Sequence, residues 1–503
     1  MTAAVLSSER EKGSGERLSP LELFHPDGEV AGVAVVGRGC PPVLIPRGGT
    51  DANQIGLLII APTSQELRQE GWLEAALDAV VPKLAVDGIV YLLASPSARA
   101  TVRRRLSGHG FQEEVAVAHV PDVLTSRYLV PLDRDLAAMA FAEVVPVWPR
   151  RRRLLSRFLR VPGAPRFLGR VLPSIGVILR RDGARPLFEW LSQLTGEEDE
   201  RLGVVVSGAP PESRLVVLSG GLGVKQAPIV AKVGEIASSR LDLEASILRE
   251  VASSARLTGV EVPKPVDVHR LSGRSLLLED RLAGQVAAAL LASRPRAFSS
   301  VVCSIADWLD AWHRSTAVVR PLEPAELRYY VLEPAESLAD ELQNGEDYVT
   351  WLRDRTRDVA AAPVPLVNVH NDLTMFNVLV RQDGLGVVDW ESAAVERFPL
   401  TDLTYAAVDA AAAAQRYEDR AVAFEDCFSS GGRHVGLVGR LLRNLATAVG
   451  ASADVAELSF HACWLHHAAN EQRDARAETE RPFAAILRQV ADRRDEWPGL
   501  FRE

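Results

Sequence analysis

The segment VNVHNDLTMFNVLVRQDGLGVVDWESA, residues 367–393, alternates short apolar runs with polar stretches. Apolar runs of this length, bounded by turn-forming residues, are typical of buried strands. Asp383-Gly384 is a dipeptide that favours a tight hairpin turn. The segment therefore predicts strand, loop, strand, turn and strand, with its polar side chains at the loop positions.

Three oxygen-bearing side chains fall in these predicted loops. Asp372 and Asn377 follow the first strand, and Asp389 follows the third. Transfer of a phosphoryl group from ATP needs a carboxylate near the acceptor hydroxyl and oxygen ligands for Mg²⁺. Asp372 would supply the carboxylate, and Asn377 and Asp389 would supply the metal ligands. The short strands between them would hold the loops rigidly in position.

The order and spacing of these residues are specific, although each residue alone is common. HxDxxxxN at residues 370–377, followed by an apolar strand that ends in DWE at residues 389–391, is similar to the catalytic and metal-binding segments of the aminoglycoside phosphotransferase and choline kinase family. The resemblance spans roughly residues 200–475. It implies ATP and Mg²⁺ as cofactors, with Asp372 as the catalytic residue and Asn377 and Asp389 as the metal ligands.

The same resemblance implies an α+β bilobal, protein-kinase-like fold, with an N-lobe and hinge at residues 197–284 and a helical C-lobe at residues 285–503. It implies that His370 is a structural residue of the catalytic loop. Asn371 stands where the family usually has glycine, but asparagine tolerates the left-handed backbone region better than most residues. Thr374-Met375-Phe376 replaces more polar residues, which bears on the choice of acceptor.

A kinase N-lobe needs a strand lysine that binds phosphates and a helix glutamate that holds it. Lys232 ends the strand APIVAK, the third in a row of predicted strands, and it is one of only five lysines in the chain. Glu244 lies early in the following helix and Glu250 is its rival as the partner. Leu243 and Leu248 are expected on the buried face of that helix.

Other cofactor contacts are expected from the same resemblance. Ser207 opens the hairpin SGAPPESR, which would cap the phosphates. Glu279 and Arg281 lie in LEDRL, which resembles the hinge strand whose backbone groups would read adenine. His461, His466 and His467 share one late segment, which either packs on the C-lobe or forms a wall of the acceptor pocket.

The first 135 residues follow a different pattern. Residues 1–27 are polar, without periodicity, and are expected to be disordered. Residues 28–135 alternate apolar strands with amphipathic helices, which predicts an open α/β sheet. Residues 78–112 resemble the second half of a class I methyltransferase. Val36-Gly37-Arg38-Gly39-Cys40 offers only a weak cofactor turn, so a shortened domain without methyltransferase activity is expected, with an active methyltransferase as the alternative.

Residues 136–196 are expected to form a connector rich in arginine. Ten arginines and no acidic residue lie between Val144 and Arg181. One interpretation is a solvated basic face that docks on the acidic half of the chain. The other is contact of Arg150–Arg181 with an anionic surface.

Charge and composition narrow the possible partners. Residues 1–196 hold 24 Lys and Arg against 20 Asp and Glu, while the remainder holds 33 against 46, which gives the net charge of −9. The acidic half argues against nucleic acid as a partner, and it is compatible with a cationic substrate. No apolar run approaches the length of a membrane span, and the four cysteines form no CxxC pair, so a cytoplasmic protein is expected.

These features predict an ATP- and Mg²⁺-dependent phosphotransferase that acts on a hydroxyl of a small molecule of the sugar, aminoglycoside or amino-alcohol type. A nucleotide-binding pseudokinase that serves as a scaffold is one alternative. A bifunctional enzyme whose N-terminal domain methylates is the other.

Overall fold

The computed structural model shows two compact units, the first holding the two larger sheets and the second holding the later helices and two small sheets. The structure describes residues 32–37, 40–46, 55–62, 65–94, 96–120, 128–131, 175–181, 202–207, 214–219, 229–235, 240–271, 274–360, 362–473 and 481–502. The predicted tail at residues 1–27, most of the predicted connector and the tip of the hairpin that follows Ser207 lie outside them.

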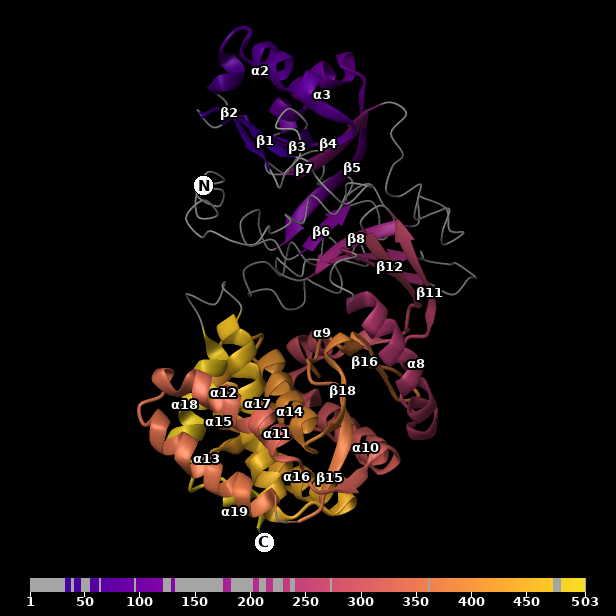
Figure 1. Cartoon of the computed structure of the whole chain (residues 1–503). Coiled ribbons are helices and arrows are strands. Elements are labelled where there is room, and N and C mark those ends of the chain that lie inside the picture. Colours follow the sequence, from indigo (N-terminus) through magenta and orange to yellow (C-terminus); the bar gives the residue numbers. More distant parts are fainter. Residues whose placement is uncertain are drawn as a thin grey trace. The chain divides into compact units, whose positions relative to one another are not determined.

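The N-terminal sheet has seven strands in the order β2-β1-β3-β4-β7-β5-β6 (Figure 1). β1, β3 and β4 run parallel, and the other neighbouring pairs are antiparallel. The strands are β1 (Gly32–Gly37), β2 (Cys40–Pro46), β3 (Ile55–Ile60), β4 (Leu84–Ala94), β5 (Phe111–Val120), β6 (Tyr128–Pro131) and β7 (Ile175–Arg181), and the helices are α2 (Trp72–Val80) and α3 (Pro96–Gly108). Apolar side chains of β3, β4, α2 and α3 form one core, as expected for parallel strands covered by helices.

The predicted connector is wrong over part of its length, because β7 comes from within it. β7 lies between β4 and β5 and pairs with both, so this segment completes the N-terminal sheet. Gly176 fits only because it has no side chain, since a Cβ there would lie 1.9 Å from the hydroxyl of Tyr91. Arg180 is buried, while Arg181 donates to the carbonyl of Val81 at 2.8 Å. These two arginines are therefore engaged in the sheet, and the other eight lie outside the described residues.

A second sheet in the first unit is antiparallel, with the order β11-β12-β10-β9-β8. Its strands are β8 (Leu202–Ser207), β9 (Arg214–Ser219), β10 (Ile229–Glu235), β11 (Pro265–Leu271) and β12 (Arg274–Asp280), and α8 (Arg240–Thr258) follows β10. The expected buried face of α8 is partly wrong. Leu243 is 55% exposed, whereas Leu241, Ala245 and Leu248 are buried. Leu243 interrupts the helical spacing of those three residues, so it points away from the core.

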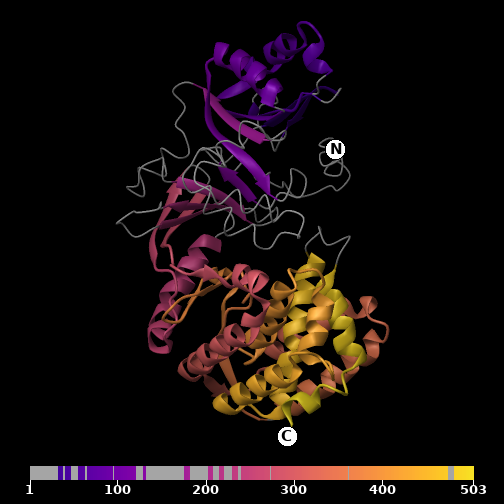
Figure 2. The same ribbon diagram turned by 180° about the vertical axis from the view of Figure 1, so that it is seen from behind.

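The second unit is mainly helical (Figures 1 and 2). Its longer helices are α9 (Ala287–Ser293), α10 (Phe298–Thr316), α13 (Gly345–Ala360), α14 (Thr401–Ala414), α15 (Arg420–Phe428), α16 (Val435–Val449), α17 (Ala453–Arg473) and α18 (Pro482–Asp492), with the short helices α11 (Pro324–Leu327), η9 (Arg328–Leu332), α12 (Glu333–Leu338) and α19 (Pro498–Phe501). α14 is rich in alanine and packs against α9, α10, α15 and α17. Small side chains let these neighbours approach closely, so α14 is the central helix of this unit.

Two small antiparallel sheets complete the second unit, with the orders β13-β16-β17 and β14-β15-β18. Their strands are β13 (Gln285–Val286), β14 (Val318–Arg320), β15 (Val364–Val369), β16 (Val378–Val380), β17 (Leu385–Val387) and β18 (Ala394–Arg397). In the part of the chain that is described, every helix is too short or too polar to cross a membrane.

Candidate active site

The segment at residues 367–393 folds as its pattern predicts. β15 leads into a loop, β16 and β17 pair as a hairpin, and a short helical turn, η11 (Trp390–Ser392), follows. The valine and leucine side chains of these strands are buried except for the half-buried Val380, while most of the polar residues occupy the loops between the strands. The loop after β15 and the loop after β17 are therefore both anchored to buried strands.

Two residues of these loops have left-handed backbone conformations. Asn371 has φ 62° and Asp389 has φ 64°, in the region that most non-glycine residues avoid. The side-chain amide of Asn371 donates to the carbonyl of Ser392 at 3.0 Å. Asn371 thus adopts the left-handed turn that was expected to tolerate asparagine, and its side chain also ties the two loops together.

His370 is a structural residue, as predicted. Its ring is buried against Trp390 in an edge-to-face arrangement, with the centroids 4.8 Å apart. Nε2 donates to the carbonyl of Val388 at 2.9 Å, and Nδ1 accepts the backbone N–H of Asp372 at 3.3 Å. One neutral imidazole therefore bridges the two loops and fixes the backbone of Asp372.

Asp372 is half-buried, and the pKa of its carboxyl group is raised. Burial, together with the negative charges of Asp389 and Asp409, raises the pKa of its carboxyl group to about 7. The Arg420 guanidinium and a hydrogen bond from Asn377 act in the opposite direction. A carboxyl group with a pKa near neutrality can exchange a proton with a substrate hydroxyl at physiological pH.

Asn377 is oriented by Asp372. Its side-chain nitrogen donates to the backbone carbonyl of Asp372 at 2.9 Å and to the Asp372 carboxylate at 3.3 Å. Because the nitrogen is used in this way, the carbonyl oxygen Oδ1 is the atom left for a ligand, and no described group donates to it. An amide oxygen and the Asp389 carboxylate are donors that suit Mg²⁺, so the residues fit a divalent cation.

Two carboxylates of α14 bind the backbone of residues 370–377, the loop that is predicted to be catalytic and is called the catalytic loop below. Asp402 accepts the backbone N–H groups of His370 and Asn371, at 2.7 and 2.9 Å. Asp409, two helical turns later, accepts the N–H of Met375 at 2.7 Å. A spacing of seven residues places both on one face of the helix. Both carboxylates are buried, and burial raises the pKa of Asp402 to about 6 although the two N–H groups oppose this.

Asp409 and its partners were missed by the sequence analysis. Arg420 forms an ion pair with Asp409 at 2.7 Å, and the Tyr417 hydroxyl donates to the same carboxylate at 2.9 Å. The guanidinium of Arg420 also lies over the ring of Tyr417, with 5.0 Å to the centroid. The available signal was an aspartate inside an alanine-rich helix, seven residues after Asp402.

In the first unit, Lys232 pairs with Glu244, as predicted, and Glu279 lies 3.4 Å from the lysine. All three side chains are buried, while Glu250 is exposed, so the rival partner is excluded. A buried cation between two carboxylates is oriented firmly, because each charge compensates the other. The role of this group in binding nucleotide stays a prediction.

The remaining predicted contacts lie at strand ends of the same sheet. Ser207 is the last residue of β8, and Arg281 follows β12 and is half-buried. The Glu279 side chain is turned to Lys232, so only its backbone is left to read adenine in the way that was expected.

A cavity of about 500 Å³ opens beside the catalytic loop in the second unit. Asn371, Ser392 and Asp402 form its edge at the loop, and α12, α17, β18 and η9 supply much of the rest. His466 and His467 line it, whereas His461 is buried and hydrogen-bonded to Tyr348 at 2.7 Å. α17 therefore does both things expected of its segment, because it packs into the core and also walls a pocket.

Residues 221–436 match the model of a family described as Phosphotransferase enzyme family. The match contains the catalytic loop and the Lys232 group. It begins after the N-terminal sheet, so the resemblance of residues 28–135 to a methyltransferase stays a prediction. No curated protein matches the chain.

Several solved structures are similar to the chain. A choline/ethanolamine kinase family protein from Mesorhizobium loti is 18% identical, with 58% of this chain and 87% of that one covered and a TM-score of 0.38. The aminoglycoside phosphotransferase APH(3'')-Id from Streptomyces rimosus, solved with ADP and streptomycin, is 17% identical, with 52% and 92% covered and a TM-score of 0.32. A putative fructosamine-3-kinase from Haemophilus somnus is 10% identical, with 60% and 94% covered and a TM-score of 0.33.

Proposed function

We propose that this chain is a phosphotransferase that moves the γ-phosphate of ATP to a hydroxyl group of a small molecule. The observation that carries the proposal is the catalytic loop, in which Asp372 and Asn377 contact each other while α14 fixes the backbone on both sides of Asp372. The match of residues 221–436 to a phosphotransferase family supports the same reaction.

Asp372 acts on the acceptor in this proposal. The hydroxyl oxygen attacks the γ-phosphorus while its proton passes to the Asp372 carboxylate, and the bond from the γ-phosphorus to the β–γ bridging oxygen breaks. ADP leaves, and the phosphate ester of the acceptor forms. The near-neutral pKa of Asp372 suits a group that first orients the hydroxyl and then takes its proton.

The cofactor contacts are part of the proposal. Asn377 Oδ1 and the Asp389 carboxylate would hold Mg²⁺, which supplies charge neutralisation at the β- and γ-phosphates when it is bound. Lys232, oriented by Glu244, would contact the α- and β-phosphates. Ser207, Glu279 and Arg281 would complete the nucleotide site through the strand ends on which they lie.

The experiment is a product screen with the purified full chain, Mg²⁺ and ATP against sugars, sugar acids, aminoglycosides and amino alcohols, read by phosphorus NMR and mass spectrometry. We expect a new phosphate ester and a matching amount of ADP. Lys232→Met should lower kcat/KM for ATP by about 100-fold, since losing a charged contact to the phosphates in the transition state costs about 3 kcal/mol. Lys83→Met, which removes an exposed lysine, is the matched control and should change nothing.

Two outcomes would reject the proposal. ATP binding without transfer to any acceptor or to a cell extract would favour the pseudokinase alternative. Equal rates for Lys232→Met and Lys83→Met would remove the Lys232 group from the active site.

The N-terminal sheet is proposed to act as an interaction or substrate-presenting domain without methyltransferase activity. Binding of S-adenosylmethionine to the full chain, measured by calorimetry, would instead favour the bifunctional alternative. We also propose that the protein works in the cytoplasm.

A further inference from the structure

The cavity beside the catalytic loop has an unusual balance of charge for a unit that is acidic as a whole. Four charged side chains line it, two acidic (Glu333 and Asp402) and two basic (Arg397 and Arg473). Two negative and two positive side chains would make the cavity neutral if all four were equally free to bind a ligand. Their contacts with other protein groups differ, however.

Both acidic groups are already compensated by the protein. Glu333 pairs with Arg328 at 3.2 Å, outside the set of residues that line the cavity. Asp402 accepts the backbone N–H groups of His370 and Asn371 at the base of the catalytic loop. A cationic ligand would have to compete with these contacts, so neither carboxylate is well placed to attract one.

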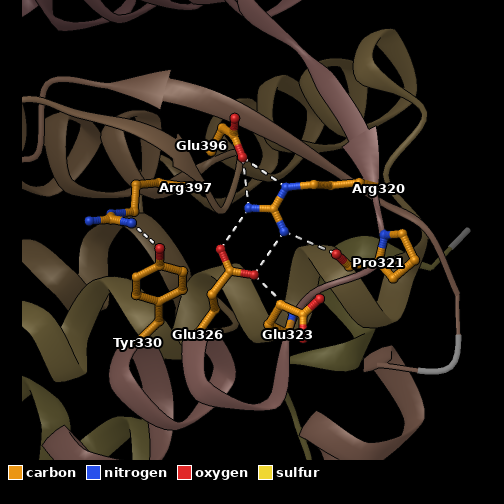
Figure 3. Close-up of polar contacts among 7 residues, drawn as sticks. All are labelled: Arg320, Pro321, Glu323, Glu326, Tyr330, Glu396 and Arg397. Atoms are coloured by element: carbon orange, nitrogen blue, oxygen red, sulfur yellow. Dashed lines mark hydrogen bonds and ion pairs between the residues drawn. The ribbon is translucent and has the colours of Figure 1, made fainter.

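Neither arginine is compensated in this way. Arg397 donates to the hydroxyl of Tyr330, and its guanidinium lies 4.3 Å from the centroid of that ring (Figure 3). The acidic neighbour Glu396 is turned to Arg320, at 2.7 Å, and Arg320 also binds Glu326 (Figure 3). Among the described residues no carboxylate forms an ion pair with Arg397.

Arg473 stands at the end of α17 and is exposed. It donates to the carbonyl of Ala469 and to the side-chain oxygen of Asn470, both neutral groups. Within the ranges that the structure describes, it also has no ion pair. Two guanidinium groups therefore line one cavity with neutral hydrogen-bond partners, and Glu326 acts on Arg397 only electrostatically, without an ion pair.

His466 lines the same cavity as the two arginines. Burial, together with the charges of Arg473 and Arg397, lowers its pKa to about 4. Both positive charges thus act at the same point of the wall, and the imidazole itself is neutral at physiological pH. The two arginines therefore add positive charge to this wall, although the C-terminal part of the chain is acidic.

We propose that this cavity binds a hydroxyl acceptor that carries a carboxylate or a phosphate, held by Arg397 and Arg473, and that it disfavours aminoglycosides and choline-like amines. Guanidinium groups bind both anions through paired hydrogen bonds, and the rings of Tyr329 and Tyr330 offer an apolar surface for the rest of the acceptor. That the bound molecule receives a phosphate rests on the proposed function, whereas the preference of the cavity for an anion does not.

The test measures binding without ATP, so that it is independent of transfer. The probes are D-glucose, D-glucosamine, D-glucuronate and D-glucose 6-phosphate, which share one ring and differ in charge, titrated by calorimetry into the full chain at constant ionic strength. We expect at least one of the two anionic sugars to bind 10-fold or more tightly than glucosamine. Their relative affinities distinguish a carboxylate from a phosphate.

Three variants assign the preference to the cavity. Arg473→Gln is exposed and should fold normally, and it should reduce the anionic preference about fivefold. Arg397→Gln with Arg473→Gln should abolish it, while Arg397→Lys should retain part of it because the charge remains. Arg296→Gln removes an exposed arginine of the short turn before α10, outside the cavity lining, and should leave the preference unchanged.

The proposal is overturned if glucosamine binds as well as the anionic sugars, if none of the four binds, or if the double variant keeps the preference. Failure of the proposed function looks different. In that case the anionic sugars bind with the expected preference, but no phosphate is transferred to any acceptor.

Discussion

The N-terminal sheet and the core around α14 are both well buried, yet they bury different kinds of side chain. Glu66 and Arg180 are the buried charged residues among the described residues of the N-terminal sheet and its helices, whose core is otherwise apolar. The core around α14 buries carboxylates, an amide and several histidines, many of which contact one loop.

The buried polar side chains lie in the core that supports the proposed active site. Burying a carboxylate costs free energy that an apolar side chain would not cost, so a core without such groups is sufficient for stability. The N-terminal sheet shows that this chain can build a core with few buried charges. The polar core of the second unit is explained by the positions that it imposes on Asp372 and Asn377.

The largest effect is expected from Asp372→Asn, which keeps the shape of the side chain and removes its ability to take a proton. We expect the rate of transfer to fall about 1,000-fold, with the circular dichroism spectrum unchanged. Glu113→Gln on β5, in an exposed ion pair with Arg103, is the matched control and should change the rate less than twofold. Similar losses of transfer rate in both variants would contradict the proposal that catalysis depends on the second unit and not on the N-terminal sheet.

Asp409→Asn should give the next largest effect, because it leaves Arg420 without its ionic partner and loosens Met375. We expect kcat to fall between about 10- and 100-fold and the free energy of unfolding to fall by about 3 kcal/mol, measured by initial rates and urea titration. Asp419→Asn changes the cap of α15 and should affect stability alone, by less than about 1 kcal/mol. An unchanged kcat in Asp409→Asn would make Asp409 a purely structural residue.

Gly176→Ala tests the scaffold. The added methyl group would collide with Tyr91, so we expect a loss of about 2 kcal/mol in the N-terminal sheet, seen as faster hydrogen exchange in β4, β5 and β7. Gly108→Ala has open space and should be neutral. Transfer should be unaffected in both variants, and a fall in kcat with Gly176→Ala would show that the sheet contributes to catalysis.

The smallest effect is expected from His313→Leu in α10. His313 is fully buried, and neither ring nitrogen has a hydrogen-bond partner in the part of the chain that is described. Burial lowers its pKa to about 3, so the folded state binds fewer protons than the unfolded state below about pH 6.5. Wild-type stability is therefore lost as the pH falls through this range.

Leucine has no titratable group, so the variant does not lose stability in this way as the pH falls. We expect the variant to be more stable by about 1 kcal/mol at pH 7.5 and by about 2 kcal/mol at pH 5.5, from urea titrations at both values. An equal gain at the two pH values would contradict the lowered pKa of His313.

The sequence predicted the parts of the site that lie close together along the chain. The loop residues from His370 to Asn377 and the strands around them follow a local pattern of apolar runs and turns, which short-range rules can interpret. The pairing of Lys232 with Glu244 could also be predicted, because Glu244 precedes the apolar run of its helix and so resembles the family pattern.

Features that depend on contacts between distant segments could not be predicted from the sequence. β7 enters the sheet between β4 and β5 from a stretch rich in arginine and proline, and only tertiary pairing selects it as a strand. Nothing in the local sequence distinguishes Asp409 within its alanine-rich helix, because its role depends on contacts with Met375 and Arg420 in other segments. The face of α8 was misjudged at Leu243 because helical spacing alone leaves the direction of the core open by about one residue.

The alanine-rich composition of α14 has a consequence for substitutions far from the acceptor. Alanine has no rotamers, so a larger side chain at Ala406 or Ala410 could not be accommodated by a change of torsion angle and would shift the helix as a body. Such a shift would move Asp402 and Asp409 together, and with them both ends of the loop that bears Asp372. Activity in this protein should therefore be sensitive to crowding at sites that never meet a substrate.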